Sequence, residues 1–274
     1  MRLGAVLPLS DRLGTGAGPG VPADGARRLE DTGFDSIWVF DAIGRGIVLP
    51  DPLIALSVAA TVTERVELGT GILQVPLRRP VELAHRILTA HLVCEGRLLL
   101  GVGAGSTVTD YAAVGVPFEE RFARFATAVP VIAGLLRGES VDTVAMEPWP
   151  AASGGPPILI GSWAGSVWVK RAATEYDGWI GSAAMTSLDV LRDGISRFRA
   201  AGGSRAVVTN IAVDLTAGDA DLDPGTSFHL RCPPQEAARR LALLAELGFD
   251  DAVVVVADHG QANLAAIRAL VPPQ

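Results

Sequence analysis

The sequence predicts an α/β protein with a (β/α)8 barrel, or TIM barrel, as a single domain over residues 1–274. Eight short runs of β-branched residues alternate with longer segments of helical period, which is typical of βα units around a parallel sheet. Eight strands fit a closed barrel better than an open sheet, which usually has about five to seven strands. The chain length also suits one barrel, because a single barrel typically takes about 250 residues.

The N-terminal half supplies four of the expected strand and helix pairs. The second helix has the clearest start, because Asp51 can cap its free amides and Pro52 fits its first turn. The strand at 97–103 is apolar on both faces, as a parallel strand covered by helices should be. The expected strands are 2–7, 36–40, 66–71 and 97–103, and the expected helices are 22–33, 51–63, 80–94 and 118–136.

The C-terminal half completes the barrel. The expected strands are 158–161, 179–181, 206–215 and 252–256, and the expected helices are 164–175, 187–201, 233–247 and 260–270. A Gly-rich stretch at 14–20, a hairpin-like insertion at 140–144 and a polar, flexible excursion at 217–227 lie between these elements. Functional groups of a barrel gather in the loops that follow its strands, so we expect the site there.

Composition narrows the classes of function. The chain is 49% hydrophobic and 19% charged with a net charge of −7, which excludes a disordered protein. The acidic balance and the lack of a run rich in Lys and Arg disfavour nucleic-acid binding. No stretch of 18 uncharged apolar residues occurs, so we expect no membrane partner and a cytoplasmic protein. Cys94 and Cys232 lack metal-ligand spacing and are expected to be buried small hydrophobic residues.

The residue inventory excludes several catalytic chemistries. Lys170 is the only lysine and falls within an expected helix, whereas a Schiff-base aldolase needs an inward lysine on a strand. His85 and His91 are six residues apart on one helix, which is the wrong spacing for a metal site on one face. No GxSxG turn marks a serine hydrolase. A barrel isomerase or lyase would need Lys, His or Glu at the strand ends, and the sequence offers none.

Glycines at the strand ends favour a bound cofactor. Residues 161–166 lie between a strand and a helix expected from Ala164, so amides at the helix N-terminus could hold a phosphate. The alternative is that Gly-rich βα turns are ordinary barrel geometry. The polar groups expected at the mouth are Asp41, Gln74, Ser106, Asp110 and Tyr111. Such an apolar, Gly-rich lining suits a flat, aromatic, phosphate-bearing cofactor that brings its own reactivity.

Three ordered segments carry a family resemblance. They are GFDSIWV at 33–39, RVELGTG at 65–71 with PLRRP at 76–80, and GRLLLGVGAG at 96–105. The segments that continue it are GVPFEER at 115–121, PILIGS at 157–162, DGW at 177–179, PQE at 234–236 and LGFD at 247–250. This ordered set closely resembles the bacterial luciferase-like family of flavin- and deazaflavin-dependent oxidoreductases, over nearly the whole chain.

The resemblance implies a (β/α)8 barrel with FMN or the deazaflavin coenzyme F-420 at its C-terminal mouth. In this family the third strand typically ends in a bulge with a non-prolyl cis peptide behind the ring, which maps onto Gly71 and Ile72. Gly103 and Gly105 would let the ring or ribityl chain pass, and residues 161–162 with the following helix would hold the phosphate. The cofactor-binding residues expected on this basis are Thr70, Gly71, Ile72, Gly103, Gly105, Gly161, Ser162, Trp163 and Gly181.

One position departs from the family pattern. Many members carry Asp-His at the end of the second strand, with the His as acid or base near the ring, whereas this chain has Asp41 and Ala42. Asp110 and Tyr111 are the nearest substitutes, because protonation of a substrate after hydride transfer needs an acid within hydrogen-bond reach. The catalytic candidates are therefore Asp110, Tyr111 and Asp41. Ordinary loop polarity is the alternative for the first two, and a capping or orienting role is the alternative for Asp41.

The expected function is hydride transfer between the deazaflavin or FMN and a small organic substrate. An FMN-dependent monooxygenase is one alternative, and a flavin-binding protein without turnover is another, supported by the missing histidine. The candidates to bind the charged tail of the deazaflavin are Arg45, Arg78, Arg79 and Arg231. The resemblance and the low charged fraction also predict a homodimer.

Overall fold

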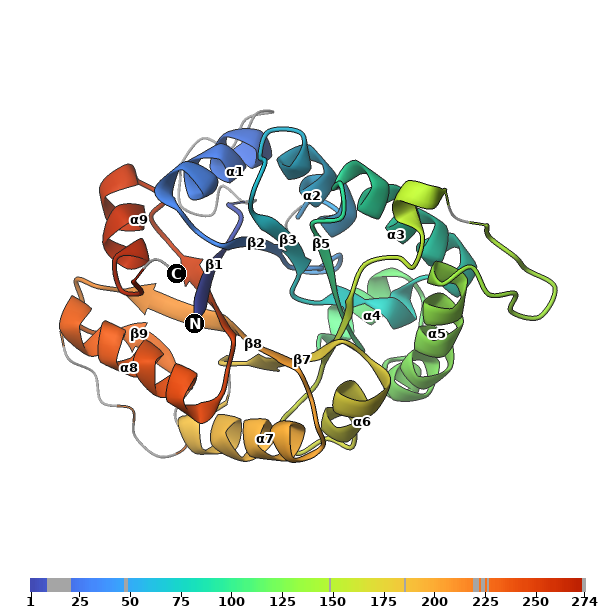
Figure 1. The fold of residues 1–274 in the computed structure, drawn as a ribbon. Coiled ribbons are helices and arrows are strands. Elements are labelled where there is room, and N and C mark those ends of the chain that lie inside the picture. The colour runs from blue at the N-terminus through green and yellow to red at the C-terminus, as the bar shows by residue number, and fades with distance from the viewer. Residues whose placement is uncertain are drawn as a thin grey trace.

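The computed structural model describes residues 1–8, 21–46, 49–147, 149–184, 186–218, 222, 225 and 227–272. Eight parallel strands form a closed barrel, because each pairs with the next and β10 pairs with both β8 and β1. The barrel strands are β1 (Arg2–Val6), β2 (Ser36–Val39), β3 (Glu67–Thr70), β5 (Leu98–Gly103), β6 (Ile158–Gly161), β7 (Gly178–Ser182), β8 (Arg205–Asp214) and β10 (Asp251–Val256). Figure 1 shows this ring of strands with the helices outside it. The predicted (β/α)8 barrel is confirmed.

Helices follow the strands in the predicted alternation and cover the barrel. They are α1 (Val21–Thr32), α2 (Pro52–Ala60), α3 (Pro80–Val93), α5 (Arg121–Leu136), α6 (Trp168–Glu175), α7 (Leu188–Ala200), α8 (Pro234–Leu247) and α9 (Gln261–Arg268). Asp51 caps α2 as predicted, because its side chain accepts hydrogen bonds from the amides of Leu53 and Ile54 at 3.0 and 3.3 Å. An antiparallel bridge between Val141 and Val144 confirms the hairpin-like insertion.

Several short elements were not expected from the sequence. They are β4 (Leu73–Gln74), which pairs with β5, β9 (His229–Arg231), which pairs with β8, and α4 (Val108–Ala113), which follows β5. Each is too short to show a hydrophobic period. The 3-10 turns are η1 (Val75–Leu77), η2 (Phe118–Glu120) and η3 (Pro150–Ala152). Residues 14–20 and much of 217–227, both expected as loops, lie outside the described residues.

Large apolar side chains fill the barrel interior. The inner cluster is Trp38, Leu99, Leu159, Ile180, Val207 and Val253, each at most 3% exposed. The Trp38 indole occupies space that β1 and β3 leave free, because a Cβ at Gly4 or Gly69 would lie 2.9 or 2.5 Å from it. A second, larger cluster packs the outer faces of the strands against the helices. The barrel axis is therefore a packed core, and any ligand must bind at an end.

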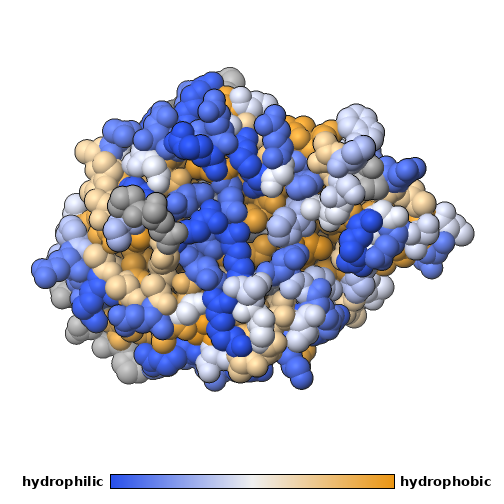
Figure 2. Space-filling model, viewed as in Figure 1, coloured by the Kyte–Doolittle hydropathy of each residue, from blue (hydrophilic) through white to orange (hydrophobic). Residues whose placement is uncertain are grey.

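The N-terminal end of the barrel is closed by charged residues. Arg2, Glu67, Arg205 and Asp251 are each the first residue of a barrel strand. Arg205 donates to Glu67 at 2.7 Å and to Asp251 at 3.0 Å, and Arg2 pairs with both carboxylates. Burial raises the pKa of Asp251, and Arg205 opposes that rise. Figure 2 shows hydrophilic residues across the middle of the face that carries the N-terminus.

Candidate active site

A cavity of about 390 Å³ opens at the C-terminal ends of β3, β5, β6, β7 and β8. This volume lies within the range of small-molecule and cofactor sites. The cavity is lined by Gly71, Ile72, Gly103, Ala104, Gly105, Ser106, Phe122, Phe125, Gly161, Ser162, Trp163, Ser166, Trp168, Ile180, Ser182, Thr209 and Asn210. Seven of the nine expected cofactor-binding residues are among them. No lining residue in the described part of the chain carries a charge.

The floor of the cavity is a bulge at the end of β3. The peptide bond between Gly71 and Ile72 is cis, as the family resemblance implies. The Ile72 side chain lies against β5 and β6, because a Cβ at Gly103 would lie 3.0 Å from it and one at Gly161 would lie 2.4 Å from it. Both glycines therefore make room for Ile72. The expectation that Gly103 lets the cofactor pass stays a prediction, because Gly103 also lines the cavity.

Gly105 is needed for a related reason. Its φ is +75°, and a Cβ there would lie 2.0 Å from Oε1 of Gln74. The other amide atom of that side chain, Nε2, donates to the Asp41 carbonyl at 2.9 Å and to Asp110 at 3.1 Å. The Gln74 amide is thus fixed behind the wall, and glycine at 105 accommodates it. The chain's own packing explains both glycines at the end of β5, although both still line the cavity.

Thr70 and Gly181 do not line the cavity. The Thr70 hydroxyl donates to the Gly101 carbonyl at 2.7 Å, and the Gly181 carbonyl accepts from the Thr209 hydroxyl at 3.3 Å. Both residues therefore support the wall from behind, whereas the sequence had placed them at the cofactor.

The turn at 162–167 forms one edge of the cavity. Helix α6 begins at Trp168, so the expected helix start at 164 was wrong. The preceding residues form a turn instead, in which the Ser166 amide donates to the Trp163 carbonyl at 2.9 Å and the Ser166 hydroxyl accepts from the Trp168 amide at 3.2 Å. The Ser162 hydroxyl oxygen is shielded from solvent and has no hydrogen-bond partner in the described structure. Such a hydroxyl fits a ligand that carries a hydrogen-bonding group, such as a phosphate.

Aromatic side chains form the outer wall. Phe125 and Trp168 pack edge to face with ring centroids 4.8 Å apart, and Phe122 and Trp163 are about half exposed at the mouth. Of these four aromatic residues, only Trp163 was expected from the sequence, because it follows the end of a strand. The other three belong to helices α5 and α6. The aromatic residues near the N-termini of these helices could have indicated this wall.

Asp41 lies beside the cavity, where it anchors the mouth. Its carboxylate accepts from both terminal nitrogens of Arg78, at 2.5 and 2.9 Å, and from the Gln74 amide at 2.8 Å. The residue is 5% exposed and the neighbouring Ala42 is 7% exposed. This carboxylate is therefore fully engaged, which favours the orienting role that we expected as its alternative.

Asp110 is completely buried behind the same wall. It accepts from Arg45 at 2.9 Å, from Gln74 at 3.1 Å and from the amides of Ile43 and Gly44 at 3.1 and 2.9 Å. Burial raises the pKa of Asp110, but these hydrogen bonds outweigh it and hold the pKa below its ordinary value. An ionised, saturated carboxylate is a poor proton donor, so this geometry favours anchoring of the loop after β2.

Tyr111 is also fully buried. Its hydroxyl donates to the Ala104 carbonyl, its ring packs edge to face against Phe118, and burial raises its pKa to about 12. The structure thus brings all three catalytic candidates together around Gln74 or the β5 end, but none of them lines the cavity.

Three polar residues of the inner wall were not expected from the sequence. Ser182 ends β7, and Thr209 and Asn210 lie within β8. Thr209 and Asn210 could have been noticed in the sequence, because this polar pair interrupts an otherwise apolar run and breaks the alternation of a strand.

Other kinds of site find no support in the described ranges. No group of three His, Cys, Asp or Glu side chains there is placed to hold a metal ion. None of the described helices combines the length and the apolar character that crossing a membrane would require.

Fold and cavity define a (β/α)8 barrel with an uncharged cavity at its C-terminal end, a cis-peptide bulge as the cavity floor and a Ser-containing turn at its edge. The model of the family described as luciferase-like monooxygenase matches residues 1–213, more than half of the chain. The chain belongs to this family, as the sequence motifs indicated.

Individual relatives carry two kinds of name. An F420-dependent glucose-6-phosphate dehydrogenase of Kineococcus radiotolerans is 37% identical over 134 residues, which are 45% of this chain and 39% of that protein. The 4-hydroxyprotoasukamycin monooxygenase of Streptomyces nodosus subsp. asukaensis is 29% identical over 163 residues, 55% of this chain and 43% of that protein. The chain thus spans about two fifths of the length of these relatives.

A solved structure shows the same fold. The monooxygenase RslO1 from Streptomyces bottropensis superposes with a TM-score of 0.78 at 19% sequence identity, and the match covers 98% of this chain and 96% of that one.

Proposed function

We propose that this protein is an oxidoreductase that binds a deazaflavin or FMN in the cavity and transfers a hydride between its ring and a small organic substrate. One observation carries the proposal. The Ser162 hydroxyl is shielded and unpartnered in a turn of the cavity wall, and a cofactor phosphate would supply its hydrogen-bond partner. Membership of the luciferase-like family and the names of the relatives support the same activity.

The chain's own residues bind and orient the cofactor. The ring supplies the hydride chemistry when bound. Ser162 and the amides of its turn would hold the phosphate, and Ile72 on the bulge would support the ring. Phe125 and Trp168 close the outer wall and exclude water from the reacting atoms.

We propose the deazaflavin rather than FMN as the cofactor. Four relatives with the deazaflavin in their names match this chain at 30% to 39% identity. Arg45 and Arg78 are held by Asp110 and Asp41, so the exposed Arg79 and Arg231 are the better candidates to meet the charged tail. A preference for FMN would instead favour monooxygenation, the alternative expected from the sequence.

The reacting part of the substrate is proposed to be uncharged. The described lining has hydroxyls, one amide and apolar groups but no cation, and a buried charge without a partner is costly. With the cofactor phosphate on the turn at 162–167, a sugar phosphate, which the dehydrogenase relatives are named for, would lack a partner in the rest of this lining. The test is anaerobic mixing of deazaflavin-loaded protein with an uncharged secondary alcohol or with glucose 6-phosphate. We expect the absorbance of the oxidised cofactor to fall with the alcohol alone, and a response to the sugar phosphate alone would contradict the proposal.

A cofactor-binding protein without turnover is the second candidate. The observation that favours it is the buried Ala42, where many family members carry a histidine, together with a described lining that has no titratable side chain. This candidate predicts a bound cofactor whose redox state no substrate changes.

Assembly as a homodimer in the cytoplasm is proposed as well. The outer faces of α2 and α3 expose Ile54, Val58, Val81 and Val93, and exposed apolar groups of this kind favour protein contacts. Cys94 is a buried free thiol, which suits a reducing compartment. Size-exclusion chromatography with light scattering should give about twice the 28.5 kDa chain mass, and a clean monomer would overturn the dimer.

A further inference from the structure

Strand β8 breaks its alternation where it reaches the cavity. Val207 packs inside the barrel and Val208 faces the helices, so Thr209 should face inward and Asn210 outward. Instead both Thr209 and Asn210 line the cavity, and Ile211 returns to the outer cluster. Two successive side chains on one side of a strand require an extra residue in its pairing.

The pairing of β8 with β10 locates this extra residue. Val208 pairs with Ala252 and Ile211 pairs with Val254, so Thr209 and Asn210 together lie opposite the single residue Val253. Asn210 has a φ of +61°, in the left-handed region that residues other than glycine seldom adopt. A β-bulge of this kind beside a site re-aims side chains toward it.

Hydrogen bonds fix the direction of the re-aimed amide. Nδ2 of Asn210 donates to the Ser182 hydroxyl at 3.0 Å and to the Thr209 hydroxyl at 3.3 Å, and the latter donates to the Gly181 carbonyl. Both N–H groups of the amide are therefore used. Its oxygen remains able to accept a hydrogen bond, and the Ser182 hydroxyl remains able to donate one.

We propose that Asn210 and Ser182 form a binding site for a ligand edge with an N–H donor beside a carbonyl acceptor. The pyrimidine ring shared by flavins and deazaflavins has such an edge, and Asn210 is the one amide in the described lining. Asn210 would accept from the ring N–H and Ser182 would donate to the adjacent carbonyl. The proposal rests on the proposed function, because it places that cofactor's polar edge at β7 and β8. A substrate hydroxyl shares this donor and acceptor chemistry, so the experiment must separate the two.

Asn210→Gly is the first variant, because glycine tolerates the same φ while the amide is removed. Ser182→Ala removes the donor without touching the bulge and serves if the first variant does not fold. Asp142→Gly is the matched control, since Asp142 also has a positive φ of 52° but lies in the exposed hairpin-like insertion. The measured quantities are the Kd for the deazaflavin and for FMN by fluorescence titration, the reduction potential of the bound cofactor, and the substrate KM.

We expect Asn210→Gly to raise the cofactor Kd about tenfold and Ser182→Ala to raise it severalfold, with a shifted potential in both and no change in the control. A cofactor Kd and potential equal to wild type in both variants would overturn the proposal. A raised KM at an unchanged cofactor Kd would also overturn it, because the cluster would then contact the substrate. Wild-type protein that binds neither cofactor would instead refute the proposed function, which this proposal requires.

Discussion

The two ends of the barrel use charge in opposite ways. At the N-terminal end, Arg2, Glu67, Arg205 and Asp251 contact one another directly and close the barrel. At the C-terminal end two charged pairs lie behind the wall, with Asp110 held by Arg45 and Asp41 held by Arg78. The described lining in front of them is uncharged and includes an unpartnered hydroxyl.

This difference indicates that the charged groups at the N-terminal end contribute to stability, whereas the C-terminal end leaves polar groups free to bind a ligand. Charges that neutralise one another across the strand starts leave no polar group for a ligand. Pairs that anchor the mouth loops from behind hold a shape without filling it, so the cavity keeps free hydrogen-bonding groups.

Breaking the closed end has the largest expected effect. Asp251 has no exposed surface, and Asp251→Ala removes one of the two carboxylates that hold the half-buried guanidinium of Arg205. We expect the free energy of unfolding to fall by about 3–5 kcal/mol in urea denaturation. Cofactor affinity should stay within about twofold, because distant sites behave independently. A parallel loss of affinity would contradict the separation of the two ends.

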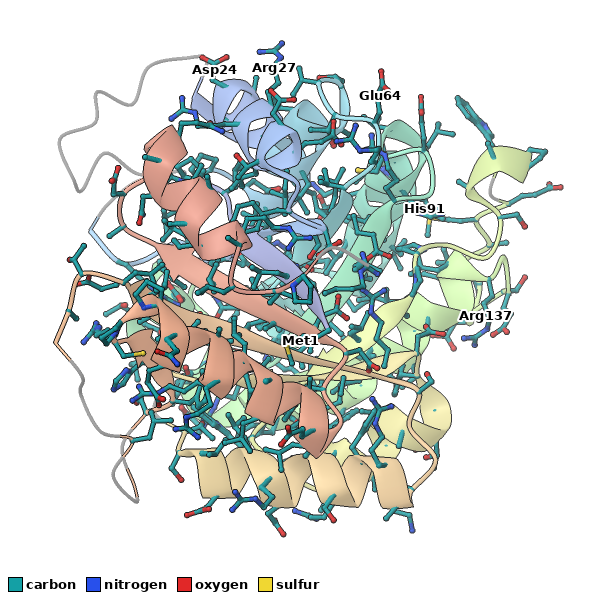
Figure 3. All side chains as sticks on the ribbon, turned by 60° about the vertical axis from the view of Figure 1, so that its left-hand side comes forward. Met1, Asp24, Arg27, Glu64, His91 and Arg137 are labelled. Carbon is teal, nitrogen blue, oxygen red and sulfur yellow. The ribbon has the colours of Figure 1, made fainter. Side chains whose placement is uncertain are left out.

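The matched control for Asp251→Ala is an exposed ion pair. Arg27 and Asp24 are 3.0 Å apart on the outer side of α1, with side chains 53% and 66% exposed (Figure 3). Asp24→Ala should cost less than about 1 kcal/mol of unfolding free energy.

Adding a side chain at Gly161, which lies beside Ile72 of the cavity floor, has the second largest expected effect. A Cβ at Gly161 would lie 2.4 Å from Ile72, whereas one at Gly165 in the same turn would meet nothing within 4 Å. Gly161→Ala should therefore displace the floor at a cost of about 1–3 kcal/mol, read as a cofactor Kd raised tenfold or more by titration. Gly165→Ala should bind as wild type does, and equal effects of the two variants would refute the role of Ile72.

Neutralising the anchor behind the wall should have a pH-dependent effect. Burial raises the pKa of Asp110, but hydrogen bonds from Arg45, Gly44 and Gln74 outweigh it and lower the pKa. A lowered folded pKa means that the carboxylate stabilises the fold above its unfolded value of about 3.9. That contribution is lost as the pH falls through the folded pKa. Asp110→Asn should cost about 2 kcal/mol at pH 7.

The pH dependence of the Asp110→Asn effect provides the control for this prediction. Urea denaturation at decreasing pH should show the difference between wild type and Asp110→Asn shrinking below a pH of about 4. A constant difference would mean that the ionised carboxylate is not what holds the loop.

Removing the Tyr111 hydroxyl is expected to have the smallest effect. Tyr111→Phe loses one hydrogen bond to the Ala104 carbonyl, at about 1 kcal/mol. Turnover and its pH profile should not change, because the hydroxyl has a pKa of about 12 and lies behind the wall. A loss of turnover with intact stability would restore Tyr111 as a catalytic residue.

The framework and the cavity glycines could be predicted from the sequence because local patterns specify them. Runs of β-branched residues located all eight barrel strands, and the family resemblance implied the cis peptide that follows Gly71. The start of α6 could not be predicted, because hydrogen bonds of Ser166 to Trp163 and Trp168 close a turn before the helix, and the sequence pattern does not show this turn.

The roles of the acidic residues were beyond the sequence because their partners are distant. Asp41 meets Arg78 37 positions away, and Asp110 meets Arg45 65 positions away. Only the folded barrel shows that these carboxylates are saturated. The inward direction of Asn210 likewise depends on a bulge that arises from pairing with β10.

The most direct test of the central claim is titration of the purified protein with the deazaflavin and with FMN, beside Ser162→Ala. Trp163 and Trp168 line the cavity and report binding by their fluorescence. The account predicts saturable quenching by one of the two cofactors, with the Kd raised about tenfold in Ser162→Ala. Binding of neither cofactor to the wild-type protein would contradict it.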